Sequence, residues 1–114
     1  MELEQEIMQI ITNGGDARAN CIKAIREARS GEITKAEALL NKAKDSLNVA
    51  HQVQTQLIQA EVRGVQTAVS LLMVHAQDHL MNALTIKELA IEMVEEIKCR
   101  IRLESQLKVE DKDK

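Results

Sequence analysis

The sequence contains no phenylalanine, tyrosine, tryptophan or proline. Without aromatic side chains there is no platform on which the bases of single-stranded nucleic acid could stack. The core must instead be built from Leu, Ile, Val, Ala and Met, the side chains of helix packing. A chain of 114 residues with this composition is expected to form one domain with a thin core, for which a partner or an oligomer is expected.

Charge and hydropathy exclude further classes of protein. The net charge is −3 and the basic residues are scattered, whereas binding to nucleic acid requires a basic patch. No apolar run reaches the roughly 18 residues of a membrane span, and Met1–Glu4 does not read as a signal peptide. Cys21 and Cys99 are isolated, without the spacing of metal ligands, so we expect reduced thiols in a cytoplasmic protein.

Apolar residues recur at intervals of three and four, which predicts three helices. The first runs from about Glu2 to Ser30, and its phase is kept across Asn13-Gly14-Gly15. This favours one helix with room for a kink over a break with Asp16 as a new cap. Ser30-Gly31 marks its end.

The second predicted helix opens with Thr34–Glu37, which fits a capping box, and it ends before Gly64. The links between the predicted helices are short, and short links make consecutive helices antiparallel neighbours. The fold class predicted is therefore all-α, an antiparallel three-helix bundle occupying residues 1–107. The charged segment 108–114 is expected to fray beyond it.

The third predicted helix, residues 66–107, carries two apolar stripes. The first contains Val69, Leu72, Ala76, Leu80, Ala83, Ala90, Val94, Ile97 and Ile101. The second lies roughly opposite and contains Leu71, Asp78, Asn82, Leu89 and Met93. One stripe suffices for packing within the bundle, so the second predicts contact with the same helix of another subunit.

Reactive side chains are concentrated in Val74–Met81, where His75, Asp78 and His79 share a helix face. Imidazole can accept a phosphoryl group or bind a metal near neutral pH. His75 lies at the border of the two stripes. It could be a phosphoryl acceptor or a metal ligand, or it could be a polar residue at a subunit interface. His79 could pair with it on zinc, orient a phosphorylated group or simply lie at the edge of the core. The glutamate base and third ligand of a zinc hydrolase are missing.

Asp78 lies within the second apolar stripe, where an unpaired carboxylate is costly. If symmetric subunits meet there, their carboxylates converge and repel one another unless protons or a cation offset the charge. A hard ion such as Mg²⁺ is one solution, and the alternative is a surface aspartate of a monomer. His51 is expected at a helix interface. If its helix packs beside His75, His51 could also support that histidine indirectly.

The run 74–81 resembles the signature of the lactose/cellobiose-type enzyme IIA of the bacterial phosphoenolpyruvate-dependent sugar phosphotransferase system. Residues 10–18 and 50–58 resemble segments of that family's first and second helices, and the Ser30-Gly31 turn matches as well. The resemblance covers nearly the whole chain. The Val-His-Ala variant of the signature, with the Val-Gln-Thr run at 53–55, is closer to the cellobiose/chitobiose branch than to the lactose branch.

The resemblance implies a homotrimer with the third helices around the three-fold axis. His75 would accept a phosphoryl group from the histidine-containing phosphocarrier protein and pass it to a cysteine of the cognate enzyme IIB. The transported sugar would be a β-linked disaccharide such as cellobiose or chitobiose. Asp78 would bind a divalent metal ion at the axis, and Gln77 and His79 would sit beside the active histidine. Some relatives have a flexible glycine-rich link before the third helix, whereas 61–64 is short and has one glycine.

Two other classes of function compete with the phosphocarrier. A structural or adaptor trimer rests on the double-striped third helix alone. A metal-dependent hydrolase would rest on His75 and His79. A phosphocarrier needs only one nucleophilic ring nitrogen that two proteins can reach, since its catalysis is mostly positioning and stabilisation of charge.

Overall fold

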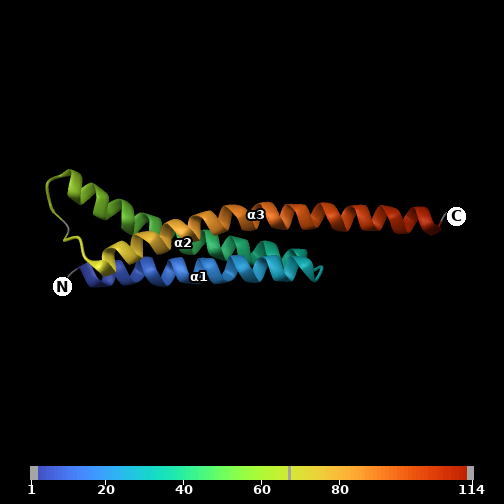
Figure 1. Ribbon diagram of the computed structural model, residues 1–114, viewed down its shortest axis with the longest axis horizontal. Coiled ribbons are helices and arrows are strands. Elements are labelled where there is room, and N and C mark those ends of the chain that lie inside the picture. Colours follow the sequence, from blue (N-terminus) through green and yellow to red (C-terminus); the bar gives the residue numbers. More distant parts are fainter. Residues whose placement is uncertain (1–2, 67, 113–114) are drawn as a thin grey trace.

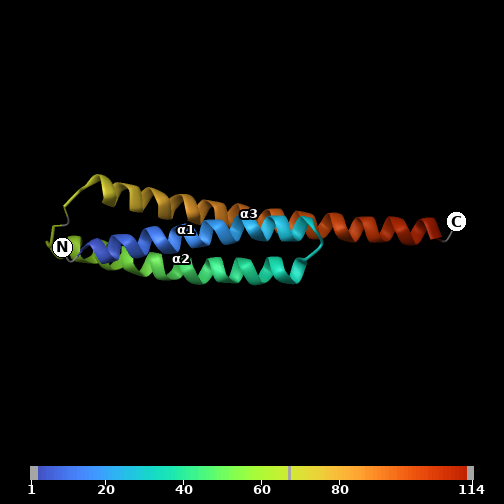
Figure 2. The ribbon, with the colours of Figure 1, turned by 90° about the horizontal axis from the view of Figure 1, so that it is seen from below.

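The computed structural model describes residues 3–66 and 68–112, with side chains described through Val109. These residues form three helices, α1 (Leu3–Arg29), α2 (Ile33–Val62) and α3 (Leu71–Lys112). The helices make a bundle measuring 72 × 20 × 19 Å, in which α2 runs antiparallel to α1 and α3 (Figure 1, Figure 2). The predicted all-α, antiparallel three-helix fold is confirmed.

The first helix is continuous through Gly14-Gly15, as the unbroken phase predicted. It ends in a tight turn at Gly31, whose φ of +87° is a conformation that side chains with a Cβ adopt at a cost. The N–H of Glu32 donates to the carbonyl of Glu27 and the N–H of Gly31 to that of Ala28, both at 2.9 Å. This pair of bonds satisfies two carbonyls at the end of α1 and turns the chain into α2.

The predicted capping box at the start of α2 was wrong. The helix begins at Ile33, and its N-cap, Glu32, makes no side-chain capping bond. Thr34 therefore lies inside the first turn, two residues past the cap position that its hydroxyl would have to occupy. The Gly31 turn sets this start, because it delivers the chain directly into helical geometry.

The bounds of α3 also differ from the prediction. The helix begins at Leu71 rather than Gln66, since the Ser70 hydroxyl accepts a hydrogen bond from the N–H of Met73 at 3.1 Å and caps the first turn. The link from α2 accordingly spans 63–70 and is longer than expected. At the other end α3 continues to Lys112, past the predicted end at Leu107. Asp113 and Lys114, also expected to fray, lie outside the described residues.

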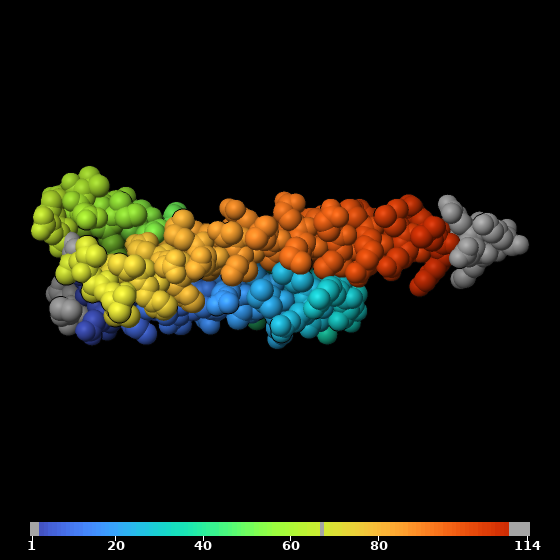
Figure 3. Space-filling model, viewed as in Figure 1, coloured from blue at the N-terminus to red at the C-terminus, as the bar shows by residue number. Residues whose placement is uncertain are grey.

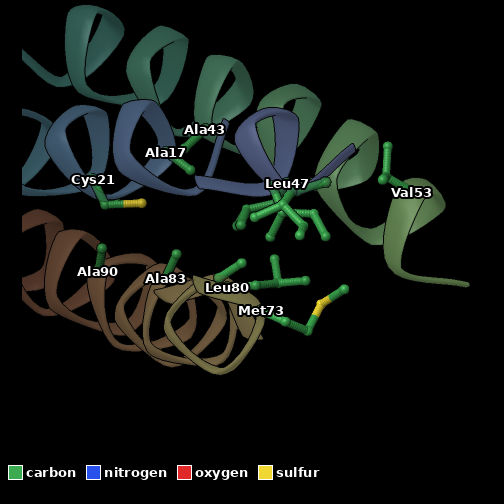
Figure 4. Packing of buried hydrophobic residues seen from close by; sticks show 13 residues of the cluster. Ala17, Cys21, Ala43, Leu47, Val53, Met73, Leu80, Ala83 and Ala90 are labelled. Carbon is green, nitrogen blue, oxygen red and sulfur yellow. The ribbon is translucent and has the colours of Figure 1, made fainter. Parts of the chain in front are cut away.

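The core is thin and rich in alanine, and Ile10 and Leu80 are among its largest fully buried side chains. Figure 4 shows part of this cluster around Leu47 and Leu80. α1 packs along both neighbours, while α2 and α3 meet over a shorter stretch because the end of α2 leans away (Figure 1). The first predicted stripe of α3 is buried from Ala76 to Ile97, and Ile101 is partly buried. Val69 and Leu72 are exposed instead, because α3 starts late, and Met73 takes the inward position.

The second stripe of α3 lies outside the core, as predicted. Leu71 is 87% exposed and Leu89 58%, on the side turned away from α1 and α2. Beyond Ile101 the helix passes the α1–α2 turn and projects alone (Figure 3), with Leu103 and Leu107 exposed. An unpartnered apolar face thus runs along much of α3.

The Gly31 turn gives a test of this account of the helix ends. Gly31→Ala should lower the free energy of unfolding by about 1 kcal/mol, because alanine is strained at positive φ. Thr34→Ala should change it by no more than a few tenths, since Thr34 caps nothing. Urea denaturation at matched protein concentration measures both. If Thr34→Ala lowered the free energy of unfolding as much as Gly31→Ala does, the assigned start of α2 would be contradicted.

Candidate functional site

Residues 75–79 of α3 direct their side chains toward different surroundings. His75 and Asp78 are exposed, while Gln77 and His79 are partly buried. Gln77 bonds to α2, and His79 lies against α1. The helical phase therefore divides a cluster that the sequence places within five residues.

The rings of His75 and His79 are stacked, with centroids 5.8 Å apart and planes inclined by 21°. Ring nitrogens point outward in the plane of each ring, so two nearly parallel rings do not direct both nitrogens at one central ion. Within the described part of the chain, no three His, Cys, Asp or Glu side chains gather as a metal site. This geometry does not favour a zinc site built on the two histidines of one protomer.

His79 sits over the two glycines of α1. A Cβ atom at Gly14 would lie 3.2 Å from Cδ2 of His79, and one at Gly15 would lie 3.3 Å from its Nε2. Both distances are shorter than the ordinary van der Waals contacts of a Cβ atom. The absence of side chains at these two positions gives the imidazole its place beside α1.

Gln77 is held from the other side of the bundle. Nε2 of Gln54, on α2, donates a hydrogen bond to Oε1 of Gln77. The sequence prediction included Gln77 but missed Gln54. A signal was present, because Gln54 occupies an apolar-stripe position between Ala50 and Leu57, where an amide needs a partner.

Asp78 belongs to the unpartnered face of α3. Its carboxylate accepts a hydrogen bond of 3.4 Å from Nδ2 of Asn82, one turn later on the same face. The chain supplies one such carboxylate on this face, with apolar Leu71 and Leu89 exposed before and after it. Hard oxygen ligands for a cation could gather here only where copies of the chain meet.

His51 was expected at a helix interface, and that prediction was wrong. The residue is exposed on α2, because Ala50 and Val53 take the adjacent inward positions. In the described residues no hydrogen bond connects His51 with His75 or its neighbours. Its predicted indirect role stays untested.

A groove of about 610 Å³ beside His79 is lined largely by α1. It contains three basic side chains, Arg18, Lys23 and Arg26. Within the described part of the chain, none of them pairs with a carboxylate within 4 Å. Their unpaired charge makes the potential on this side of the histidines more positive, which favours nearby anionic groups.

The two cysteines lie away from this site and are free. Cys21 is buried in the core, and burial raises the pKa of its thiol. Cys99 is exposed on α3, where its sulfur accepts a hydrogen bond from Arg102. Neither thiol joins the histidine cluster.

The family described as "PTS system, Lactose/Cellobiose specific IIA subunit" matches residues 5–98. The chain belongs to this family. The match covers nearly all of α1, the whole of α2 and α3 as far as Lys98, including residues 75–79. The resemblance inferred from residues 74–81 is thereby confirmed.

Individual relatives agree in sequence and fold. The chain is 50% identical over 94 residues to the lichenan-specific phosphotransferase enzyme IIA component of Bacillus subtilis, covering 82% of this chain and 86% of the relative. It superposes on a crystal structure of the cellobiose-specific enzyme IIA of Bacillus anthracis with a TM-score of 0.85 and 45% identity, covering 92% and 94% of the two chains. The chain also superposes on a IIA(chitobiose) chain solved in complex with HPr, from the Escherichia coli phosphotransferase system. The TM-score is 0.74 and the sequence identity 38%, and the match covers 86% of this chain and 95% of the relative.

This IIA chain is thus a phosphotransfer component of a sugar phosphotransferase system. In the described residues, no helix combines the length and apolar character needed to cross a membrane.

Proposed function

We propose that His75 accepts a phosphoryl group from the histidine-containing phosphocarrier protein HPr and passes it to a cysteine of the cognate enzyme IIB. The observation that carries the proposal is the setting of His75. Its imidazole is exposed to partner proteins while one neighbour, the His79 ring, stacks against it. The basic side chains of the groove beside His79 favour the approach of a doubly charged phosphoryl group.

The chemistry needs little apparatus beyond this setting. A lone pair on one ring nitrogen of His75 attacks phosphorus, forming a new P–N bond. The P–N bond to the donor histidine breaks, and its electron pair stays on the donor nitrogen. Onward transfer breaks the bond to His75 and forms a P–S bond to the enzyme IIB thiolate. Because similar bonds are exchanged, catalysis consists mainly of aligning the groups and stabilising charge.

The partners and substrate follow from the relatives and from the resemblance. A IIA(chitobiose) relative forms a complex with HPr, which supports HPr as the donor. Relatives are named for lichenan, cellobiose and N,N'-diacetylchitobiose, which supports uptake of a β-linked disaccharide. The site of action would be the cytoplasm, where the donor protein operates.

Asp78 has a separate role in this proposal. Three copies of the chain would meet along the unpartnered face of α3, burying Leu71 and Leu89 and bringing three Asp78 carboxylates together at the axis. A divalent ion, with Mg²⁺ the best match to carboxylate and water oxygens, would bind these side chains and offset their repulsion. Gln77, two residues after His75, would support the active histidine, and its side-chain amide is held by the hydrogen bond from Gln54.

Replacement of His75 tests the first role. Incubation with phosphoenolpyruvate, enzyme I and HPr should place one acid-labile phosphoryl group on the wild-type chain and none on His75→Ala. His51→Ala is the matched control, because that exposed imidazole should not be needed. Intact-mass spectrometry at neutral pH gives the number of phosphoryl groups on each chain. Equal labelling of His75→Ala and wild type would rule out His75 as the acceptor.

Replacement of Asp78 tests the second role. The wild-type trimer should weaken in EDTA, because removing the cation leaves three carboxylates facing one another. Asp78→Leu should stay trimeric with or without EDTA, since leucine continues the apolar stripe. Asp45→Leu, which removes an exposed carboxylate of α2, is the control, and its trimer should weaken in EDTA as much as the wild-type trimer does. Sedimentation velocity reports the mass, and a monomeric Asp78→Leu beside a trimeric wild type would contradict the axial placement.

A further inference from the structure

Two adjacent glycines in the middle of a regular helix need an explanation. Glycine is among the least favourable residues in a helix interior, yet Gly14 and Gly15 lie in the continuous helix α1. In the described residues, positive φ occurs only at Gly31 and Gly64, so backbone conformation does not require glycine at 14 and 15. The requirement must therefore come from space.

The space is occupied by one residue. The three heavy atoms nearest to an added Cβ at Gly14 are Cδ2, Nε2 and the carbonyl oxygen of His79. At Gly15 the single neighbour within 4 Å is Nε2 of the ring, whereas Gly31 and Gly64 have nothing within that distance. The glycine pair thus forms a seat in α1 for the His79 imidazole.

The seated ring is also the neighbour of the proposed phosphoryl acceptor. His79 lies one turn after His75, and the two rings stack with centroids 5.8 Å apart. His75 is itself exposed, and within the described residues the His79 ring stacks against it, so the position of one ring bears on the position of the other. A displacement of His79 would pass directly to His75.

We propose that Gly14-Gly15 and His79 act together as a positioning device for His75, an inference that rests on the proposed phosphocarrier function. α1 fixes the His79 ring, and the stack fixes the plane of His75, so that one ring nitrogen faces the incoming phosphorus. Phosphoryl transfer is sensitive to such alignment, because attacking and leaving atoms must lie in line. His79 is a positioning residue and takes no phosphoryl group.

Gly15→Ala is the sharpest test, since the added methyl meets only the tip of the His79 ring. Transfer from HPr should slow on the order of tenfold at saturating HPr, as misplacement of a reacting group predicts. The apparent affinity for HPr should hardly change. The thermal unfolding midpoint should not fall, because alanine favours the helix. Asp16→Ala, next along α1 and exposed, is the control and should transfer at the wild-type rate.

A double-mutant cycle separates positioning from packing. His79→Ala should itself slow transfer, and adding Gly15→Ala to it should slow transfer no further, because the ring that the methyl would displace is gone. The side-chain ¹⁵N resonances of His75 should shift in Gly15→Ala and stay in place in Asp16→Ala. A merely structural role for Gly15 would leave these resonances unmoved.

The outcomes distinguish this inference from the proposed function. If His75→Ala is inert while Gly15→Ala transfers at the wild-type rate with unshifted His75 resonances, the positioning device is wrong and His75 remains the acceptor. An equal slowing by Gly15→Ala with and without His79 would also overturn it. Labelling of His75→Ala would instead remove the proposed function on which the inference rests.

Discussion

Close packing between α1 and α3 is the constraint on which the site depends. A chain without aromatic side chains fills its core with small ones, and here Ala17 and Cys21 of α1 face Ala83 and Ala90 of α3 (Figure 4). Small side chains let helix axes approach closely, and at Gly14-Gly15 the ring of His79 lies where side chains on α1 would otherwise project. The same feature that limits the size of the core therefore lets the His79 ring lie against α1.

The rotation of successive residues around the axis of α3 places neighbouring side chains in different environments. Gln77 is tied to α2 and His79 is seated on α1, while Asp78 faces away from both helices. His75 lies between the supported side and the open side, where a partner protein can reach it. The two roles that we propose, phosphoryl transfer at His75 and assembly at Asp78, can therefore lie in one short motif without the two residues sharing a ligand.

The periodic features were predictable from the sequence, and the contacts between helices were not. Helical phase revealed the continuity of α1, the buried stripe of α3 and the exposed stripe that contains Asp78, because each depends only on spacing along one helix. The start of α3 was misplaced because a single Ser70 hydroxyl decides it. The Gln54 partner of Gln77 and the seat for His79 were missed, since each depends on the register between two helices, which no spacing within one helix encodes.

Direct identification of the phosphorylated atom tests the central claim best. The ¹⁵N-labelled chain, phosphorylated with phosphoenolpyruvate, enzyme I and HPr, should show ³¹P–¹⁵N coupling to one ring nitrogen of His75. The imidazoles of His51 and His79 should show none, and His79 should respond only by a change of chemical shift. Coupling at His79 or His51, or phosphorus bound to no histidine, would contradict the account of an exposed acceptor held in place by a seated neighbour.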